Sequence, residues 1–231
     1  MAVLAYLAVQ LGLGASGGFD SWSWSDNVRS RLCSDYDNYS REEFGVNHIL
    51  VLEGSPRKGN TSTVVDWVLA GMGKGNKVTR VRLGELHIEP CQECFTCAGT
   101  KKAAGCAQED DMVELYDKMI GADLVIWASP IFCWNVTGQT KMALDRCFAL
   151  LTGEDLLKGS KWALVITAGG DAFDGADLAV QMFSRLANYG GIKYVGQHVV
   201  APCPDGAKLA ASAALKKSAK GFGKELAKAL R

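Results

Sequence analysis

The sequence predicts an α/β protein with a doubly wound, three-layer arrangement around a parallel sheet of five strands. From Asn47 onward, short apolar segments alternate with segments of helical periodicity, and such alternation is typical of βαβ units with right-handed crossovers. The four successive apolar residues at positions 49–52 indicate a strand buried on both faces, as in a parallel sheet. For this number of units we expect the strand order 2-1-3-4-5.

The elements follow one another with short connections. Strands are expected at residues 48–53, 77–83, 123–129, 161–167 and 192–200, and helices at residues 61–72, 109–121, 137–151, 176–189 and 207–230. Asp110 and Asp111 stand at the start of the second helix, where negative charge suits the helix dipole. The last helix has a lysine-rich outer face, and we expect it to break near Gly221 and Gly223.

Composition indicates a globular protein of ordinary type. The chain has 231 residues, of which 48% are hydrophobic and 22% charged, enough for one domain with a full core. Lys plus Arg and Asp plus Glu both number 25, so the charge balance favours neither a nucleic-acid nor a membrane partner.

The first 45 residues differ from the rest. Residues 1–18 are apolar and small, but the first basic residue is Arg29, so the basic start of a secretory signal is missing. The apolar run is interrupted at Gln10 and is too short to span a bilayer. We therefore expect a poorly ordered N-terminal extension at residues 1–45, or an upstream translation start, before a domain at residues 46–231. A packed arm or a weak export signal is the alternative.

The loop after the first strand, EGSPRKGNTST, has the features of an anion site. A strand, a polar loop with two glycines and a helix start bring free backbone N–H groups to one point. Arg57 and Lys58 add positive charge, so a phosphate is the expected guest. The alternative is an ordinary turn whose hydroxyls cap the helix. The loop matches neither the Walker A motif nor the G-x-G-x-x-G fingerprint.

Two further loops should lie at the same edge, because ligands in doubly wound sheets bind at the carboxyl ends of the strands. The loop at residues 130–136 exposes Phe132 and Trp134 beside Asn135, which suits a flat heterocycle, although the aromatics could instead fill the core. The loop at residues 168–175 has paired glycines that allow backbone to approach a ligand, or it is a simple turn. Together the three loops favour a mononucleotide with a flat ring, and FMN fits best.

These motifs also resemble a known family. GSPRKGNT, a cysteine cluster followed by DDM, SPIFxxNVTGQxKxxxDR and TAGG occur in this order over residues 46–200. The set resembles the flavodoxin-like NADPH-dependent FMN reductases, and in particular the iron–sulfur flavoproteins. The resemblance implies a flavodoxin-like fold with bound FMN.

The resemblance also implies roles for individual residues. The FMN phosphate would be held by Ser55, Arg57, Gly59, Asn60, Thr61 and Ser62. The ring would be bordered by Pro130, Ile131, Phe132, Trp134 and Asn135, with Ala168, Gly169 and Gly170 on its other side. Phe132 stands where the family often has tyrosine, so a phenolic hydrogen bond is lost. Lys141, Asp145 and Arg146 match the family's helix motif and are interpreted as structural, with an Asp–Arg ion pair.

Four cysteines, inserted at residues 91–106, have the spacing C-x2-C-x2-C-x8-C: Cys91, Cys94, Cys97 and Cys106. Thiolates at intervals of three can converge on a [4Fe–4S] cluster, and a fourth can close it. Structural zinc would prefer two separated pairs. Free or disulfide-forming thiols are the main alternative, because the last gap in iron–sulfur flavoproteins is typically shorter. Since the segment follows the second strand, we expect these cysteines on the edge of the flavin loops, in this subunit or facing a neighbour.

The remaining cysteines are interpreted as packing or incidental residues: Cys33, Cys133, Cys147 and Cys203. The sequence thus favours a cytoplasmic FMN-dependent oxidoreductase that passes electrons from NAD(P)H or a ferredoxin-type donor to an acceptor. The resemblance implies a homodimer or homotetramer. No catalytic side chain is expected, because the chemistry belongs to the cofactor. The alternatives are an electron carrier or thiol redox sensor without turnover of its own, and a mononucleotide-binding regulatory module without flavin.

Overall fold

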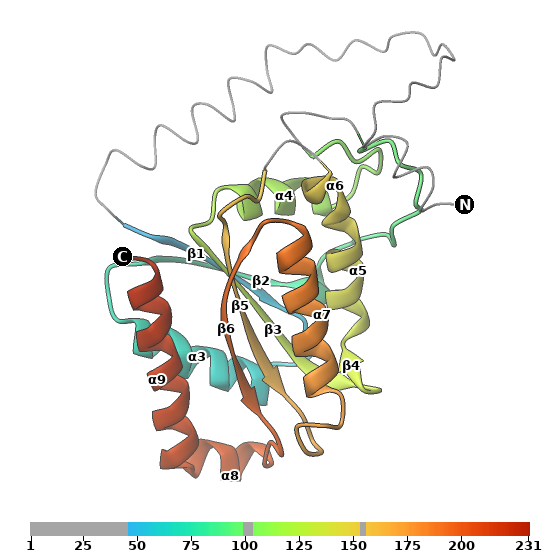
Figure 1. The fold of residues 1–231 in the computed structure, drawn as a ribbon. Helices are drawn as coiled ribbons and strands as arrows, with labels where there is room; N and C mark the ends of the chain where they lie inside the picture. The colour runs from blue at the N-terminus through green and yellow to red at the C-terminus, as the bar shows by residue number, and fades with distance from the viewer. Residues whose placement is uncertain (1–45, 99–103, 153–155) are drawn as a thin grey trace, which may run out of the picture. The chain divides into compact units, whose positions relative to one another are not determined.

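The computed structural model describes residues 46–98, 104–152 and 156–231, and Figure 1 gives the arrangement of their helices and strands. The extension expected at residues 1–45 lies outside the described residues. None of the described helices is long and apolar enough to cross a membrane.

Five parallel strands form the centre of the fold. They are β1 (His48–Glu53), β2 (Lys77–Arg82), β3 (Leu124–Phe132), β5 (Lys161–Thr167) and β6 (Lys193–Val200). Their order is β2-β1-β3-β5-β6, and the two-residue strand β4 (Asn135–Val136) pairs antiparallel with the end of β3. The doubly wound parallel sheet is confirmed. The predicted order 2-1-3-4-5 needs correction, because β4 is an additional strand that the short apolar patterns do not reveal.

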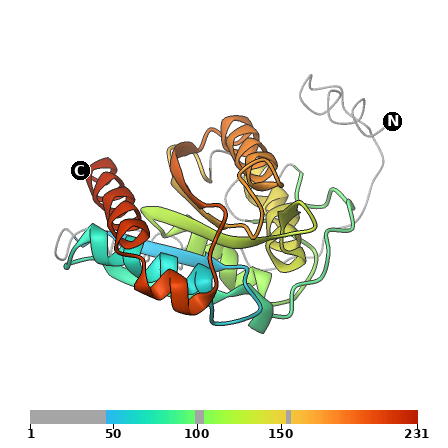
Figure 2. The same ribbon diagram turned by 90° about the horizontal axis from the view of Figure 1, so that it is seen from below.

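Helices cover both faces of the sheet (Figure 2). One face carries α3 (Asn60–Met72), α8 (Gly206–Ala211) and α9 (Ala213–Ala229). The other carries α4 (Met112–Ile120), α5 (Gly138–Arg146), α6 (Phe148–Leu151) and α7 (Ala176–Tyr189). The 3-10 turn η1 (Leu83–Glu85) follows β2. Alternate residues of β1 serve the two layers, with Ile49 and Val51 packed towards α3 and Leu50 and Leu52 towards α4.

The C-terminal helix differs from expectation. α9 continues through Gly221 and Gly223, and the chain breaks instead at Ser212, whose side chain accepts a hydrogen bond from the N–H of Leu215 and caps α9. A Cβ on Gly223 would lie 2.0 Å from the carbonyl oxygen of Val68, whereas a Cβ on Gly221 would meet nothing within 4 Å. Gly223 therefore marks the close crossing of α9 over α3 rather than a helix break.

The two glycines should respond oppositely to alanine. Gly221→Ala should raise the free energy of unfolding by roughly 0.5–1 kcal/mol, because alanine is the better helix residue and has room here. Gly223→Ala should lower it by about 1–3 kcal/mol, because the new methyl forces α9 away from α3. Urea unfolding of the two variants measures both values. Equal effects would show that the helix crossing does not need Gly223.

Candidate functional site

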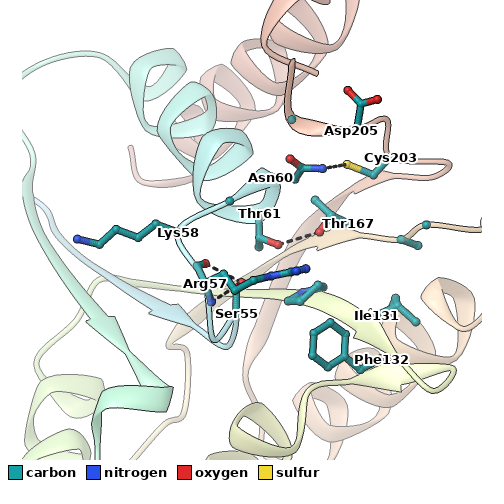
Figure 3. A pocket seen from close by; sticks show the side chains of 15 residues that line it. Ser55, Arg57, Lys58, Asn60, Thr61, Ile131, Phe132, Thr167, Cys203 and Asp205 are labelled. Carbon is teal, nitrogen blue, oxygen red and sulfur yellow. Dashed lines mark hydrogen bonds between the residues drawn. The ribbon is translucent and has the colours of Figure 1, made fainter. Parts of the chain in front are cut away.

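A cavity of about 550 Å³ opens at the carboxyl edge of the sheet (Figure 3). This volume lies in the range of small-molecule and cofactor sites. The three predicted loops and the loop after β6 all contribute to it. The lining residues are Ser55, Arg57, Lys58, Gly59, Asn60, Thr61, Pro130, Ile131, Phe132, Thr167, Ala168, Gly169, Cys203, Asp205 and Gly206.

The first loop offers unused donors at one end of the cavity. α3 begins after Gly59, and no side chain caps it. The hydroxyls of the loop therefore do not occupy the N–H groups of the first turn, in contrast to the alternative of an ordinary turn whose hydroxyls cap the helix. Ser55 folds the loop locally: its Oγ donates to the carbonyl of Arg57 at 2.8 Å and accepts from the Arg57 N–H at 3.3 Å. In Figure 3 Arg57 extends across the cavity and Lys58 points away from it. This end of the cavity suits an anion.

Two side chains fasten the start of α3 to neighbouring elements. The Asn60 amide donates to the Pro204 carbonyl at 2.8 Å and lies 3.4 Å from the sulfur of Cys203. The hydroxyls of Thr61 and Thr167 lie 2.8 Å apart, and both residues are buried. Since one hydroxyl of such a pair donates to the other, the second retains a proton for a ligand.

Ser62 lies outside this cavity. Its hydroxyl donates to Glu53 at 2.6 Å, on the opposite side of the loop. The structure thus brings together five of the six residues expected at the phosphate, and Ser62 is the exception.

A strained hairpin lies at the apolar end of the cavity. Cys133 and Trp134 connect β3 to β4 and have φ values of 45° and 61°. Positive φ at both central residues is the geometry of a type I′ turn, which glycine and asparagine prefer. Phe132 lines the cavity, but Trp134 does not and is 64% exposed. Asn135 is also absent from the lining, and its side-chain oxygen accepts from the N–H of Val136.

Replacing Trp134 by glycine should relieve this strain. We expect a gain of about 1 kcal/mol in the free energy of unfolding, and a rise of roughly 2–4 °C in the melting temperature. Trp134→Ala is the matched control, because it removes the ring but keeps a side chain at positive φ. Thermal unfolding compares the two. If the alanine variant gains as much as the glycine variant, backbone strain is not the cause.

The third loop lines the cavity only in part. Ala168 and Gly169 contribute, whereas Gly170 does not. A Cβ on Gly170 would lie 2.1 Å from a carboxylate oxygen of Asp174, which also accepts from the N–H of Asp171. Gly170 therefore serves the fold of its own turn.

The loop after β6 was not expected at the site. Cys203, interpreted as incidental from the sequence, lines the cavity together with Asp205 and Gly206. Its N–H donates to the carbonyl of Ala168 at 2.6 Å, which joins this loop to the third one. Burial raises the pKa of the Cys203 thiol, although the hydrogen bond from Asn60 opposes this effect. The rule that ligands bind at carboxyl ends applies to the fifth parallel strand too, and it would have found these residues.

The cysteine segment lies at the other end of the molecule. The carbonyl of Cys97 accepts from the Thr152 hydroxyl at 3.2 Å, and Phe95 packs edge-on against Phe148 with ring centroids 6.2 Å apart. In Figure 1 this segment lies beside α6, opposite to α8 and β4. The hydroxyl of Thr137 donates to the carbonyl of Gly54 at the edge of the cavity, and helices α5 and α6 lie between Thr137 and Thr152. At the rise of an α-helix, these two helices place Thr152 roughly 20 Å from Thr137. The expected position on the flavin edge of the same subunit is wrong.

The thiols themselves have different environments. Cys91 and Cys94 are exposed, Cys97 is buried and Cys106 is half-buried. The Thr96 hydroxyl donates to Cys94 and lowers its pKa. Burial raises the pKa of Cys97, and the neighbouring thiols of Cys106 and Cys94 add to this. Within residues 46–98, 104–152 and 156–231, no three Cys, His, Asp or Glu side chains are close enough to hold a metal ion.

A buried ion pair anchors this segment to α5. Arg146 donates to both carboxylate oxygens of Asp110 at 2.5 and 3.0 Å, and to the carbonyl of Glu89 at 2.9 Å. Only 1% and 3% of the two side chains are exposed. The expected structural Asp–Arg pair therefore exists, but its acid is Asp110; Asp145 pairs with Lys141 on the surface of α5.

Fold and cavity define a class: a doubly wound α/β protein with a mononucleotide-sized site at the switch point of the sheet. Residues 47–203 match the family described as NADPH-dependent FMN reductase. This match covers more than half of the chain, so the chain belongs to that family, as its motifs indicate.

Known proteins agree with this assignment. An iron–sulfur flavoprotein of Methanocaldococcus jannaschii is 35% identical over 131 residues, 56% of this chain and 65% of that protein. One from Archaeoglobus fulgidus is 33% identical over 146 residues, 62% of this chain and 73% of the relative. The chain thus spans about two thirds of the length of these relatives.

Solved structures share the fold. An NAD(P)H:quinone oxidoreductase from Methanothermobacter marburgensis gives a TM-score of 0.62 at 16% identity, over 80% of this chain and 96% of that one. An FMN-dependent NADH-azoreductase from Bacillus anthracis, in complex with FMN, gives 0.56 at 16% identity, over 78% of this chain and all of the other.

Proposed function

We propose that the chain binds FMN in the cavity at the carboxyl edge and acts as an NAD(P)H-dependent flavoprotein oxidoreductase. One observation carries the proposal: a single cavity joins an uncapped helix start to an apolar half formed by Ile131, Phe132 and Ala168. Such a cavity matches a ligand with an anionic end and a flat apolar end. The chain's membership of the NADPH-dependent FMN reductase family supports the same ligand.

The phosphate end has the charge that this ligand requires. The first-turn N–H groups of α3 and the positive end of its dipole attract an anion. Arg57 takes part in no ion pair found among the described residues and reaches over the cavity. The acidic residue in the lining, Asp205, is balanced locally, because its carboxylate accepts from the N–H of Lys208 at 3.1 Å and lies 3.4 Å from that residue's ammonium.

FMN, when bound, supplies hydride and single-electron transfer. The chain's own residues bind the phosphate, border the ring through Ile131 and Phe132, and leave one rim open beside Trp134 for an electron donor. We propose NAD(P)H or a ferredoxin-type protein as donor, with no side chain acting as acid or base. We place the reaction in the cytoplasm, where clustered thiols remain reduced, and propose a homodimer or homotetramer.

Substitution of the phosphate-loop cation tests the cavity assignment. Arg57→Ala should weaken FMN binding at least tenfold, because a charge-assisted contact to phosphate is lost. Lys58→Ala, which removes an equal charge that points away, should change it less than threefold. The FMN-loaded protein should oxidise NADPH or NADH with a quinone as acceptor under anaerobic conditions. If the protein cannot be reconstituted with FMN, the result would favour the alternative of a regulatory module that binds a mononucleotide without flavin.

The cysteine segment supports a second candidate, a thiol redox sensor or electron carrier. Cys94 is exposed and its pKa is lowered by Thr96, which favours the reactive thiolate. A carrier or sensor would show negligible NAD(P)H oxidation without a partner reductase. A [4Fe–4S] cluster on Cys91, Cys94, Cys97 and Cys106 is the further alternative, supported by the spacing and by the relatives' names. Anaerobic iron quantification decides, together with loss of absorbance near about 400 nm in Cys94→Ser.

A further inference from the structure

Behind the phosphate loop lies a buried carboxylate that the cavity itself does not use. Glu53 ends β1 and is 2% exposed. Its oxygens accept from the Ser62 hydroxyl at 2.6 Å and from Nε of Arg80 at 2.6 Å. Arg80, on β2, also pairs with Asp66 of α3. A buried carboxylate is costly unless its hydrogen bonds are satisfied, and here a hydroxyl and a guanidinium satisfy them.

These bonds close the loop at its base. The loop runs from Gly54 to Gly59, between Glu53 at the end of β1 and the first turn of α3, to which Ser62 belongs. Their contact fixes the first turn of α3 relative to the end of β1, and Arg80 ties both elements to β2. Ser62 and Asp66 are one helical turn apart, so two successive turns of α3 are held.

Neither Glu53 nor Ser62 reaches the FMN cavity. Both line a separate, polar hollow of about 490 Å³ on the other side of the loop, to which Lys58 and Gly59 also contribute. The Ser62 proton is already given to Glu53. Any effect of this pair on a phosphate must therefore pass through the position of the loop and of the helix start.

We propose that Glu53 is a positioning residue that sets the selectivity of the site for the phosphorylated flavin, acting through Ser62. This inference rests on the proposed FMN function. Donors held in place before binding give affinity, because the ligand does not have to order them. The Glu53–Ser62 bond holds the N–H groups of the first turn where the phosphate of FMN arrives. Riboflavin, which lacks the phosphate, gains nothing from this order.

Titration of the full-length apo chain with FMN and with riboflavin tests the proposal. Ser62→Ala and Glu53→Gln should each weaken FMN binding roughly tenfold and change riboflavin binding less than twofold. The double variant should bind FMN no more weakly than the single variant with the lower affinity, because both changes break the same Glu53–Ser62 hydrogen bond. Ser62→Thr, which keeps the hydroxyl, should restore FMN binding. Ser218→Ala, at an exposed serine of α9, is the matched control, and its affinity for FMN should stay unchanged.

Three results would overturn the proposal. Equal loss of FMN and riboflavin would mean a general structural role, and unchanged FMN binding in Ser62→Ala would mean no role. Multiplying effects in the double variant would mean that the two residues act separately. If Glu53→Gln does not fold, Ser62→Ala and Ser62→Thr decide alone. Failure of the proposed function looks different, because the wild type itself would then bind FMN no better than riboflavin.

Discussion

Replacing Arg146 by methionine should lower the free energy of unfolding by about 3–5 kcal/mol, because it leaves a buried carboxylate without its cation. The Asp110 side chain is 3% exposed and takes two of its hydrogen bonds from Arg146. The substitution also removes the donor to the Glu89 carbonyl. The segment between β2 and α4 should therefore loosen from α5, which urea unfolding and hydrogen exchange at residues 86–90 would measure.

The same helix provides the control. Lys141 and Asp145 form an exposed ion pair one turn away, with 50% and 47% of their side chains exposed. Lys141→Met should cost no more than about 0.5 kcal/mol, because solvent screens such pairs. Losses of equal size in the two variants would mean that burial does not decide the strength of the Asp110–Arg146 pair.

The pair should also make stability depend on pH. Burial alone would raise the pKa of Asp110, but hydrogen bonds from Arg146 and from the N–H groups of Glu89 and Met112 outweigh it and lower the pKa. A carboxyl with a lowered folded pKa stabilises the protein above its unfolded pKa, about 3.9, and loses that contribution as the pH falls through the folded value. The difference between wild type and Arg146→Met should therefore shrink below about pH 4.

Gly54→Ala should have the second large effect. A Cβ at this position would lie 1.7 Å from Oγ1 of Thr140 and 2.9 Å from Oγ1 of Thr137. The backbone cannot move away easily, because the Gly54 N–H donates to Ala128 and its carbonyl accepts from Thr137. We expect a loss of about 2–4 kcal/mol in stability and at least tenfold weaker FMN binding, since the phosphate loop begins here.

Gly138→Ala is the matched control for this clash. Gly138 is the first residue of α5, and a Cβ there would meet nothing within 4 Å. Alanine should raise stability by roughly 0.5–1 kcal/mol through its higher helix propensity. If Gly54→Ala proved as stable as Gly138→Ala, the close packing of the loop on α5 would be refuted.

The sheet and the cavity loops were predictable because they depend on local signals. Apolar runs such as residues 49–52 specify buried parallel strands, and a polar loop with glycines before a helix specifies a helix start with free backbone N–H groups. The strand–helix alternation then places three loops at one edge. The family resemblance rests on the same loops, and the matching of residues 47–203 to that family confirms it.

The remainder depends on tertiary contacts that no local pattern contains. Ser62 resembles its neighbours in the sequence but turns to Glu53, because a buried carboxylate needs its proton. Cys203 reaches the cavity only because β6 ends beside β5. The cysteine segment runs to the far edge because Arg146 holds it along α5.

The most direct test of the central claim is a fluorescence titration of the apo chain with FMN and, in parallel, with riboflavin. The proposed site predicts saturation at one FMN per chain and an affinity at least tenfold above that for riboflavin, because only FMN uses the uncapped start of α3. Absence of saturable FMN binding, or equal affinity for the two flavins, would contradict a phosphate site at Ser55–Thr61.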